Sequence, residues 1–118
     1  AAAAEAETGG ALNRDVEAFL ASSDDAPRAF AFSDLAFADG SAEIRSQDRR
    51  ELTQLGRMLA DRPEVTLRVV GRAGDEALAT RRAEAVAAAL IANGVSTLNI
   101  ETEAGEGAGA TELVILSR

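Results

Sequence analysis

The residues best suited to chemistry lie in one short stretch, where Gly71-Arg72-Ala73-Gly74 is followed by Asp75. We expect this stretch to be a turn that leads from a strand into a helix. The free N–H groups of a helix N-terminus can bind an anion, so Gly71 and Arg72 are candidate ligand-binding residues. As a phosphate loop, however, the stretch lacks both the Gly-Lys-Ser/Thr ending and the GxGxxG spacing. Asp75 is also a natural helix cap, because its carboxylate can accept a hydrogen bond from the first turn.

The remaining chemical groups of the chain are few. Histidine and cysteine are absent, which removes the usual general base, the commonest metal ligand and thiolate chemistry. Only carboxylates, hydroxyls and arginines remain, and no pair of them has an acid/base spacing, so we expect no enzyme and no catalytic residues. The acidic cluster Glu101, Glu103 and Glu106 lacks the alternating ligands of a calcium loop, and we expect it to be solvated. The sequence therefore predicts no metal site and no cofactor.

Composition narrows the class of protein further. The 118 residues are enough for one small domain with a thin, aliphatic core, since only four residues are aromatic. The net charge of −8 argues against a nucleic-acid partner, because phosphates demand a basic face. No apolar run approaches the roughly 20 residues that a transmembrane helix needs, so we expect no transmembrane segment in this chain. The sequence leaves the oligomeric state open.

The candidate turn must be positioned by the elements around it. Val65, Leu67 and Val69 alternate with polar residues, as in a strand that is wet on one face. After Asp75, apolar residues recur at helical spacing and predict one buried stripe: Leu78, Ala79, Ala83, Val86, Ala87, Leu90 and Ile91. Gly94 is suited to the left-handed position that follows the helix.

The chain before this unit is predicted to contain a tail, a helix, a strand and a second helix. Residues 1–10 are alanine-rich and indicate a flexible tail, and residues 11–25 form an amphipathic helix. Its apolar positions are Leu12, Val16, Phe19 and Leu20. Phe30 and Phe32 belong to an extended segment, which Asp39-Gly40-Ser41 ends as a turn. The second helix is expected to be capped by Ser46, to bury Leu52, Leu55, Met58 and Leu59, and to stop before Pro63.

The chain after the central helix is predicted to add two strands. Leu98 and Ile100 alternate with polar residues in a third strand, residues 103–110 form a glycine-rich loop, and Leu113–Leu116 is the last strand. The element order is then β-α-β-α-β-β after an N-terminal helix. We expect an α/β (α+β) two-layer sandwich, with a mixed four-stranded sheet that carries its helices on one face.

Several short motifs of the chain resemble those of the OmpA-like domain shared by OmpA, MotB and Pal proteins. Phe37 with Gly40-Ser41-Ala42 matches the Phe-x-x-Gly-Ser-Ala turn of the family, and Leu78 with Arg82-Ala83 matches its Leu-Ser-x-x-Arg-Ala helix start. Asn93-Gly94-Val95 fits the helix exit of the family, and Glu112-Leu113-Val114-Ile115 its last strand. The resemblance covers roughly residues 28–117 and places the OmpA-like domain at residues 28–118.

The resemblance implies a site for peptidoglycan, in which an aspartate and an arginine grip the charged end of the diaminopimelate stem peptide. Arg82 aligns with the family arginine. Asp75 does not align with the family aspartate, because the usual Gly-His-Thr-Asp is replaced by Gly71-Arg72-Ala73-Gly74 in a shorter loop. The helix and the Asn-Arg-Arg run that precede the last strand in the family are also missing. The interpretation without a ligand makes Asp75 a helix cap and Arg82 a solvated charge.

These departures favour a non-catalytic envelope module with a degenerate pocket. We expect it to lie in the periplasm, in association with the outer membrane, and to serve as a scaffold or to bind another envelope protein. Binding of the peptidoglycan stem peptide would then be weak or lost. The alternative is retained non-covalent wall binding through Arg82, Asp75, Gly71 and Arg72.

Overall fold

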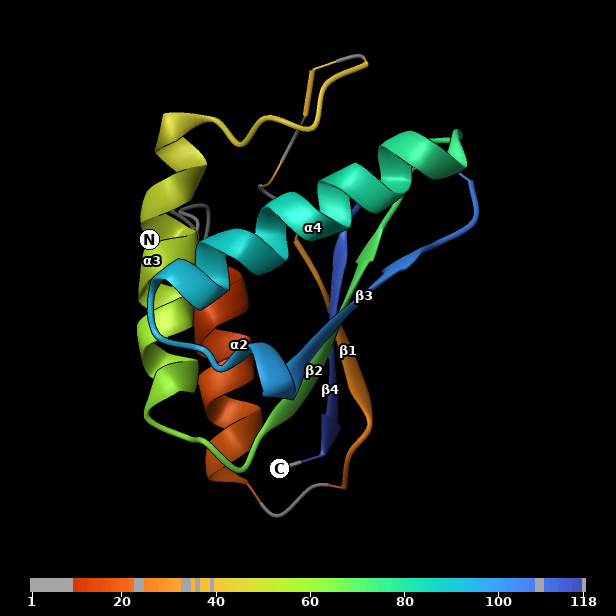
Figure 1. The fold of residues 1–118 in the computed structure, drawn as a ribbon. Helices are drawn as coiled ribbons and strands as arrows, with labels where there is room; N and C mark the ends of the chain where they lie inside the picture. The colour runs from red at the N-terminus through yellow and green to blue at the C-terminus, as the bar shows by residue number, and fades with distance from the viewer. Residues whose placement is uncertain are drawn as a thin grey trace, which may run out of the picture.

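The structure, a computed structural model, describes residues 10–22, 25–32, 35, 37–38, 40–107 and 110–117. Its helices are α2 (Gly10–Ala21), α3 (Ser46–Ala60), α4 (Glu76–Ala92) and the short 3-10 helix η1 (Thr97–Asn99). Its strands are β1 (Arg28–Ala31), β2 (Thr66–Gly71), β3 (Ile100–Ala104) and β4 (Glu112–Ser117). Figure 1 shows α2, α3 and α4 together on one side of the sheet, which confirms the predicted two-layer α+β architecture.

The four strands form one mixed sheet in the order β1-β4-β2-β3. β4 is antiparallel to both of its neighbours, whereas β2 and β3 are parallel. A parallel pair needs a long crossover, and α4 provides it between β2 and β3. The turn into α4 therefore lies at the C-terminal end of β2, beside the end of β3.

The core lies between the sheet and the helices. Most of the residues that the sequence placed in the core are buried, among them Phe30, Phe32, Leu55, Leu67, Val69, Val86, Leu90 and Ile115, whereas Ile91 of the predicted α4 stripe is half-buried. The apolar face of α2 joins the same core, since Val16 and Phe19 are buried and the ring of Phe19 meets that of Phe30 edge-on at 5.8 Å. α2 is therefore packed as part of the domain and is not a separate appendage.

Some predicted details are wrong. Ser46 does not cap α3; the N-cap is Arg45, whose guanidinium pairs with Asp48 at 3.0 Å. Leu98 does not belong to the third strand, because the hydroxyl of Ser96 accepts the N–H of Leu98 and curls the chain into η1. β3 continues instead to Ala104, inside the predicted loop, since its pairing with β2 extends to Gly71.

Three further predictions concern the buried stripe of α3, the residue after α4, and segments at the N-terminus and before α3. Met58 is only partly buried, whereas the rest of the predicted α3 stripe is buried. Gly94 has a φ of 115° directly after α4, as predicted. Residues 1–9 and Asp39 lie outside the described residues, so most of the predicted tail and one residue of the predicted turn stay predictions. Gly10, the last residue of the predicted tail, is instead the first residue of α2.

Candidate functional site

Asp75 is the N-cap of α4. Its carboxylate Oδ2 accepts a hydrogen bond from the backbone N–H of Leu78 at 2.9 Å, which confirms the capping interpretation. The cap uses one of the free N–H groups of the first turn and places a negative charge at the helix N-terminus. Both effects oppose the binding of an anion at this turn.

Gly71 ends β2 at a point of close backbone contact. A Cβ atom at this position would overlap backbone atoms of Ala79 and Ala83, so only glycine lets α4 pack this closely on the strand. The carbonyl of Gly71 accepts the N–H of Gly105 at 2.7 Å, which links β2 to the connection that follows β3. Packing therefore explains Gly71 without a ligand.

The side chain of Arg72 binds two residues around the connection between β3 and β4. Its Nη2 forms an ion pair with Oε1 of Glu112 at 3.1 Å, and its Nη1 donates to the carbonyl of Glu106 at 3.0 Å. The side chain is half-buried. The guanidinium thus neutralises a carboxylate of its own chain at the place where the sequence suggested an anion site.

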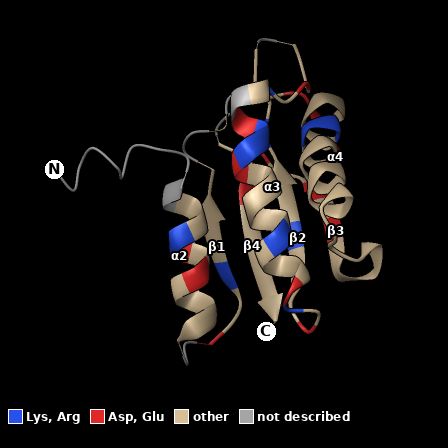
Figure 2. Ribbon diagram, turned by 90° about the vertical axis from the view of Figure 1, so that its left-hand side faces the viewer, with Lys and Arg blue, Asp and Glu red and all other residues tan. Residues whose placement is uncertain are grey.

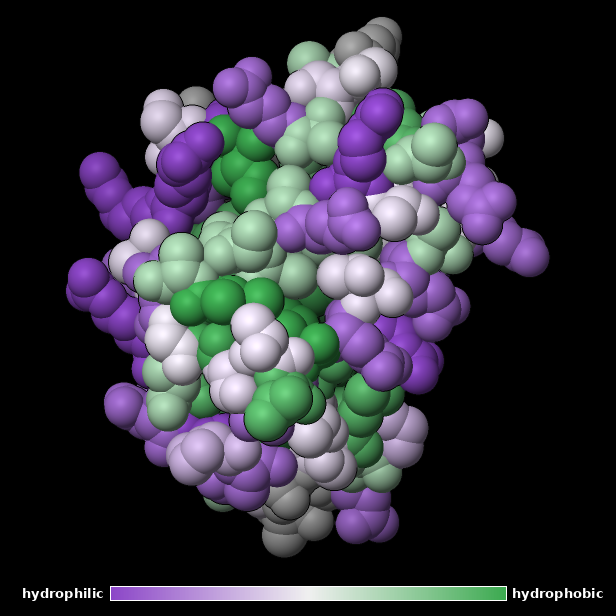
Figure 3. All heavy atoms as spheres, viewed as in Figure 1, coloured by the Kyte–Doolittle hydropathy of each residue, from purple (hydrophilic) through white to green (hydrophobic). Residues whose placement is uncertain are grey.

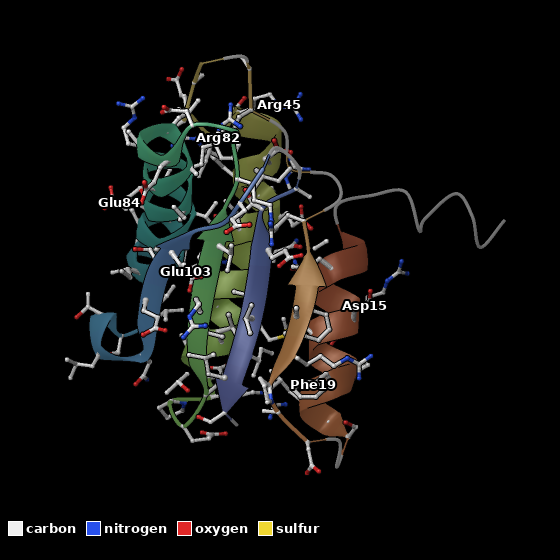
Figure 4. All side chains as sticks on the ribbon, turned by 90° about the vertical axis from the view of Figure 1, so that its right-hand side faces the viewer. Asp15, Phe19, Arg45, Arg82, Glu84 and Glu103 are labelled. Atoms are coloured by element: carbon white, nitrogen blue, oxygen red, sulfur yellow. The ribbon has the colours of Figure 1, made fainter. Side chains whose placement is uncertain are left out.

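Arg82 joins three segments of the chain. Its Nε donates to the carbonyl of Ser41 at 2.8 Å, its Nη2 to that of Ala38 at 3.1 Å and its Nη1 to that of Arg72 at 3.1 Å. The guanidinium also lies 4.9 Å from the centre of the Phe37 ring, within cation–π range. Figure 4 shows Arg82 between α4 and the segment that leads into α3. Arg82 is therefore held by the fold and is not the solvated charge of the ligand-free interpretation, while its binding of a ligand stays a prediction.

The geometry of these bonds bears directly on ligand binding. Nε and Nη2 form the side-on edge of the guanidinium, which can hold both oxygens of a carboxylate. Here that edge holds the carbonyls of Ser41 and Ala38. Asp75 lies seven residues before Arg82, on the same side of α4 and about 10 Å away along the helix axis at 1.5 Å per residue. The Arg82 side chain covers part of that separation, because its Nη1 reaches the carbonyl of Arg72, three residues before Asp75.

The segment held by Arg82 lines a shallow hollow that the sequence did not predict. Its lining residues are Ala38, Ser41, Glu43, Ile44, Arg45, Ser46 and Arg49, and its volume is about 520 Å³. Arg45 pairs with Asp48, and Nε of Arg49 donates to the carbonyl of Ile44 at 3.4 Å. The partners of Arg82 are backbone carbonyls, which every residue has. The sequence therefore could not indicate them, and only the fold shows which carbonyls lie near Arg82.

The acidic cluster of the sequence is exposed, but two of its members have a partner. Arg68 on β2 lies 2.7 Å from Glu101 and 3.4 Å from Glu103, both on β3. The hydrogen bond to Glu101 is the main reason why the pKa of Arg68 is raised above its usual value. Across the described ranges, no three acidic residues are gathered as a metal site, and no helix is long and apolar enough to cross a membrane.

Comparisons with known proteins identify a family by sequence and similar folds among solved structures. The model of the OmpA family matches residues 36–117. No curated protein sequence matches the chain. Among solved structures, the peptidoglycan-associated lipoprotein of Burkholderia pseudomallei has 20% identity and a TM-score of 0.61, over 71% of this chain and 88% of that one. The periplasmic domain of Helicobacter pylori MotB (residues 90–256) has 15% identity and a TM-score of 0.66, over 81% and 76%. An outer membrane protein of Borrelia burgdorferi has 13% identity and a TM-score of 0.63, over 82% and 93%.

Proposed function

The chain belongs to the OmpA family, and on this premise we propose that it is a non-catalytic module of the bacterial cell envelope whose ligand pocket is filled by its own backbone. A family relative of similar fold is described as associated with peptidoglycan. In this chain, the arginine that aligns with the ligand-binding arginine of the family instead holds two loops in place. The proposed role is therefore structural: a scaffold, or a surface for another envelope protein.

The bonds of Arg82 are the observation that carries this proposal. A stem-peptide carboxylate can reach the side-on edge of the guanidinium only by displacing the carbonyls of Ser41 and Ala38. Hydrogen bonds to a charged group contribute roughly 1.5–3 kcal/mol each, so the exchange of carbonyls for a carboxylate leaves a small net gain. Even a dissociation constant of 1 mM needs about 4 kcal/mol. Weak or absent wall binding follows.

Retained peptidoglycan binding is the second candidate. It is favoured by the family and by the placement of Asp75 and Arg82 on the same side of α4, one anionic and one cationic. In that case Asp75 would take the ammonium group and Arg82 the carboxylate of the diaminopimelate end. The carboxylate of Asp75 would then have to serve the ligand in addition to the N–H of Leu78.

A sacculus pull-down separates the two candidates. The wild-type chain is compared with Asp75→Ala, with Arg82→Ala and with Arg81→Ala, an exposed arginine beside Arg82 that serves as the matched control. The lipoprotein domain of Burkholderia pseudomallei provides a positive control. We expect little wild-type binding and no difference between variants that circular dichroism shows to be folded. Strong binding that Asp75→Ala and Arg82→Ala abolish, and Arg81→Ala preserves, would establish wall binding instead.

The proposal includes a location in the periplasm, in association with the outer membrane. Its support is the family and the similarity in fold to the periplasmic domain of MotB and to an outer membrane protein. Fractionation of the native host tests it, with the chain expected among periplasmic or envelope proteins. Recovery from the cytoplasm alone would contradict the location and leave the fold assignment unaffected.

A further inference from the structure

One edge of the sheet is open along β1. In the strand order β1-β4-β2-β3, β1 has a single neighbouring strand, β4, with which it pairs antiparallel. The N–H of Phe32 donates to the carbonyl of Thr111 at 2.9 Å, so Phe32 directs its backbone N–H towards the β4 side. Because these directions alternate along an antiparallel strand, Ala29 and Ala31 direct their N–H and carbonyl groups the other way, out of the sheet.

The outward backbone groups of β1 have no partner in the part of the chain that the structure describes. No hydrogen bond joins the N–H or carbonyl of Ala29 or Ala31 to another described residue, and both residues are exposed. The opposite edge of the sheet is different, because β3 carries Glu101 and Glu103, and charged side chains protect an edge strand from pairing. The edge of β1 is therefore the one that can accept another strand.

Helix α2 extends beyond this edge and forms a groove with it. Figure 2 and Figure 4 view the molecule from opposite sides, and both place α2 on the outer side of β1, away from β4. The groove has a volume of about 480 Å³ and is lined by all of β1 and by Leu12, Asp15, Ala18 and Phe19 of α2. A helix is about 10–12 Å across and strands lie about 4.7–4.9 Å apart, so α2 is wide enough to cover β1 and one further strand position.

This arrangement favours a single incoming peptide over a second copy of the chain. Antiparallel pairing of two β1 strands around a two-fold axis would place both α2 helices on the same face of the joined sheet. Each helix would cover the strand of the other copy as well as its own, so the two helices would occupy the same space. A hydrophobic face, such as the one that Figure 3 shows around α4, specifies no partner, whereas outward N–H and carbonyl groups specify an extended backbone.

Charges at the two ends of the groove indicate the chemistry of the peptide. Arg28 lies at the start of β1, with its guanidinium 5.6 Å from the ring centre of Phe19 and 5.8 Å from that of Phe30. Asp15 is exposed one helical turn before Phe19, towards the end of the groove at Ala31 (Figure 4). An acidic side chain opposite Arg28 and a basic one near Asp15 would complement these charges. Between them, a side chain opposite Phe30 would face α2 and should be apolar.

We propose that the edge of β1 binds an extended segment of another envelope protein as a fifth strand, antiparallel to β1, with the pattern basic-x-apolar-x-acidic. The backbone of Ala29 and Ala31 forms its hydrogen bonds, and Asp15 and Arg28 set its direction. Four backbone groups on a short strand give a modest affinity, with a dissociation constant on the order of 0.1 mM. The inference deepens the proposed role as a surface for another envelope protein and rests on it. It uses none of the residues tested by the sacculus pull-down, so the two experiments fail independently.

Fluorescence anisotropy of a labelled peptide, titrated with the full chain, tests the proposal. The probe contains Lys-Thr-Val-Thr-Glu, which in antiparallel pairing places the valine opposite Phe30 and the glutamate opposite Arg28. Methylation of the backbone nitrogens of both threonines removes the N–H groups that face Ala29 and Ala31, and it should weaken binding at least tenfold. Replacement of the glutamate by lysine should weaken binding about threefold, because lysine would then face Arg28.

Two variants of the chain provide a matched comparison. Ala18 is exposed on α2 and lines the groove, so Ala18→Trp should block the groove and weaken binding at least tenfold. Ala88 is exposed on α4, and Ala88→Trp should leave binding unchanged. In heteronuclear NMR spectra of the wild-type chain, the amides of Ala29 and Ala31 should shift most on addition of the unmodified peptide.

The proposal is overturned if the peptide does not bind at about 1 mM, if its methylated form binds equally well, or if Ala18→Trp has no effect. Binding that requires deletion of residues 1–9 would overturn it in favour of the chain's own N-terminal segment. A dimer of the wild-type chain that Ala18→Trp dissociates would overturn it in favour of a second copy.

Discussion

A single arginine holds together the end of the molecule where a ligand was expected. Arg82 extends from α4 and contacts the segment before α3 through Ser41 and Ala38, and the turn after β2 through the carbonyl of Arg72. An arginine has five N–H donors in a planar fork, so one side chain can satisfy carbonyls from separate segments. A lysine has a single nitrogen and cannot reproduce these directions.

The first prediction concerns the contribution of Arg82 to stability. Arg82→Ala removes three hydrogen bonds and the contact with Phe37, and we expect it to lower the free energy of unfolding by about 2–3 kcal/mol after allowance for partial exposure. Arg82→Lys should recover less than half of that loss. Urea denaturation followed by circular dichroism measures both, with Arg81→Ala as the control. If Arg82→Ala leaves the midpoint unchanged, the residue is free for a ligand and its structural role is refuted.

The second prediction concerns the cap of α4. Asp75→Ala leaves the N–H of Leu78 without its acceptor and should cost about 1 kcal/mol of stability, whereas Asp75→Ser should cost much less because serine also caps. Thermal unfolding of both variants provides the measurement. Equal losses for alanine and serine would show that the charge of Asp75, and not its hydrogen bond, is what matters.

At the scale of elements, the close packing of α4 on β2 depends on one glycine. Gly71→Ala places a Cβ among backbone atoms of Ala79 and Ala83, which cannot move unless the helix shifts. We expect a loss of about 3 kcal/mol or more, since overpacking typically costs 1–3 kcal/mol and backbone is less yielding than side chains.

Gly74→Ala provides the matched control for this third prediction. Gly74 has a φ of +77°, and a Cβ atom at this position would have no atom within 4 Å. Alanine there should therefore cost only about 1–2 kcal/mol, the cost of a left-handed backbone conformation. Chemical denaturation of both variants should rank Gly71→Ala as the more destabilised. The reverse order would mean that the approach of α4 to β2 is looser than the structure shows.

For the whole molecule, the domain extends beyond the segment that the family model matches. That match begins at residue 36, after α2 and β1, yet Val16 and Phe19 of α2 are buried in the common core. Phe30 of β1 contacts Phe19 and is buried as well. A thin, aliphatic core depends strongly on each large side chain that it contains.

The fourth prediction follows from this packing. Phe19→Ala should lower the free energy of unfolding by about 3–5 kcal/mol, as for other buried phenylalanines. Ala18→Gly, at an exposed position of the same helix, should cost about 1 kcal/mol through helix propensity alone. Guanidinium titrations compare the two. Equal, small effects would show that α2 is a dispensable appendage.

The sequence by itself determined most of the helices and strands of this protein and most of the residues on their inward faces. The period-two pattern around Leu67 and the helical spacing from Leu78 to Leu90 are local properties of the chain, and burial of one face requires them. Asp75 and Gly94 were also predictable, because helix caps are set by residue types next to the helix. Leu98 was misplaced because a short alternation of apolar and polar residues does not distinguish a strand from a 3-10 turn capped by Ser96.

Only the tertiary structure decided what the candidate site residues do. The sequence singled out Gly71, Arg72 and Arg82, but their partners come from segments up to 44 residues away, as in the bond from Arg82 to Ala38. These partners are mainly backbone atoms: the carbonyls bound by Arg72 and Arg82, and the helix backbone against Gly71. Every residue carries such groups, so residue types cannot reveal which ones meet. Contact between distant backbone segments is set by how the helices pack on the sheet. That packing determined which carbonyls the guanidinium of Arg82 binds.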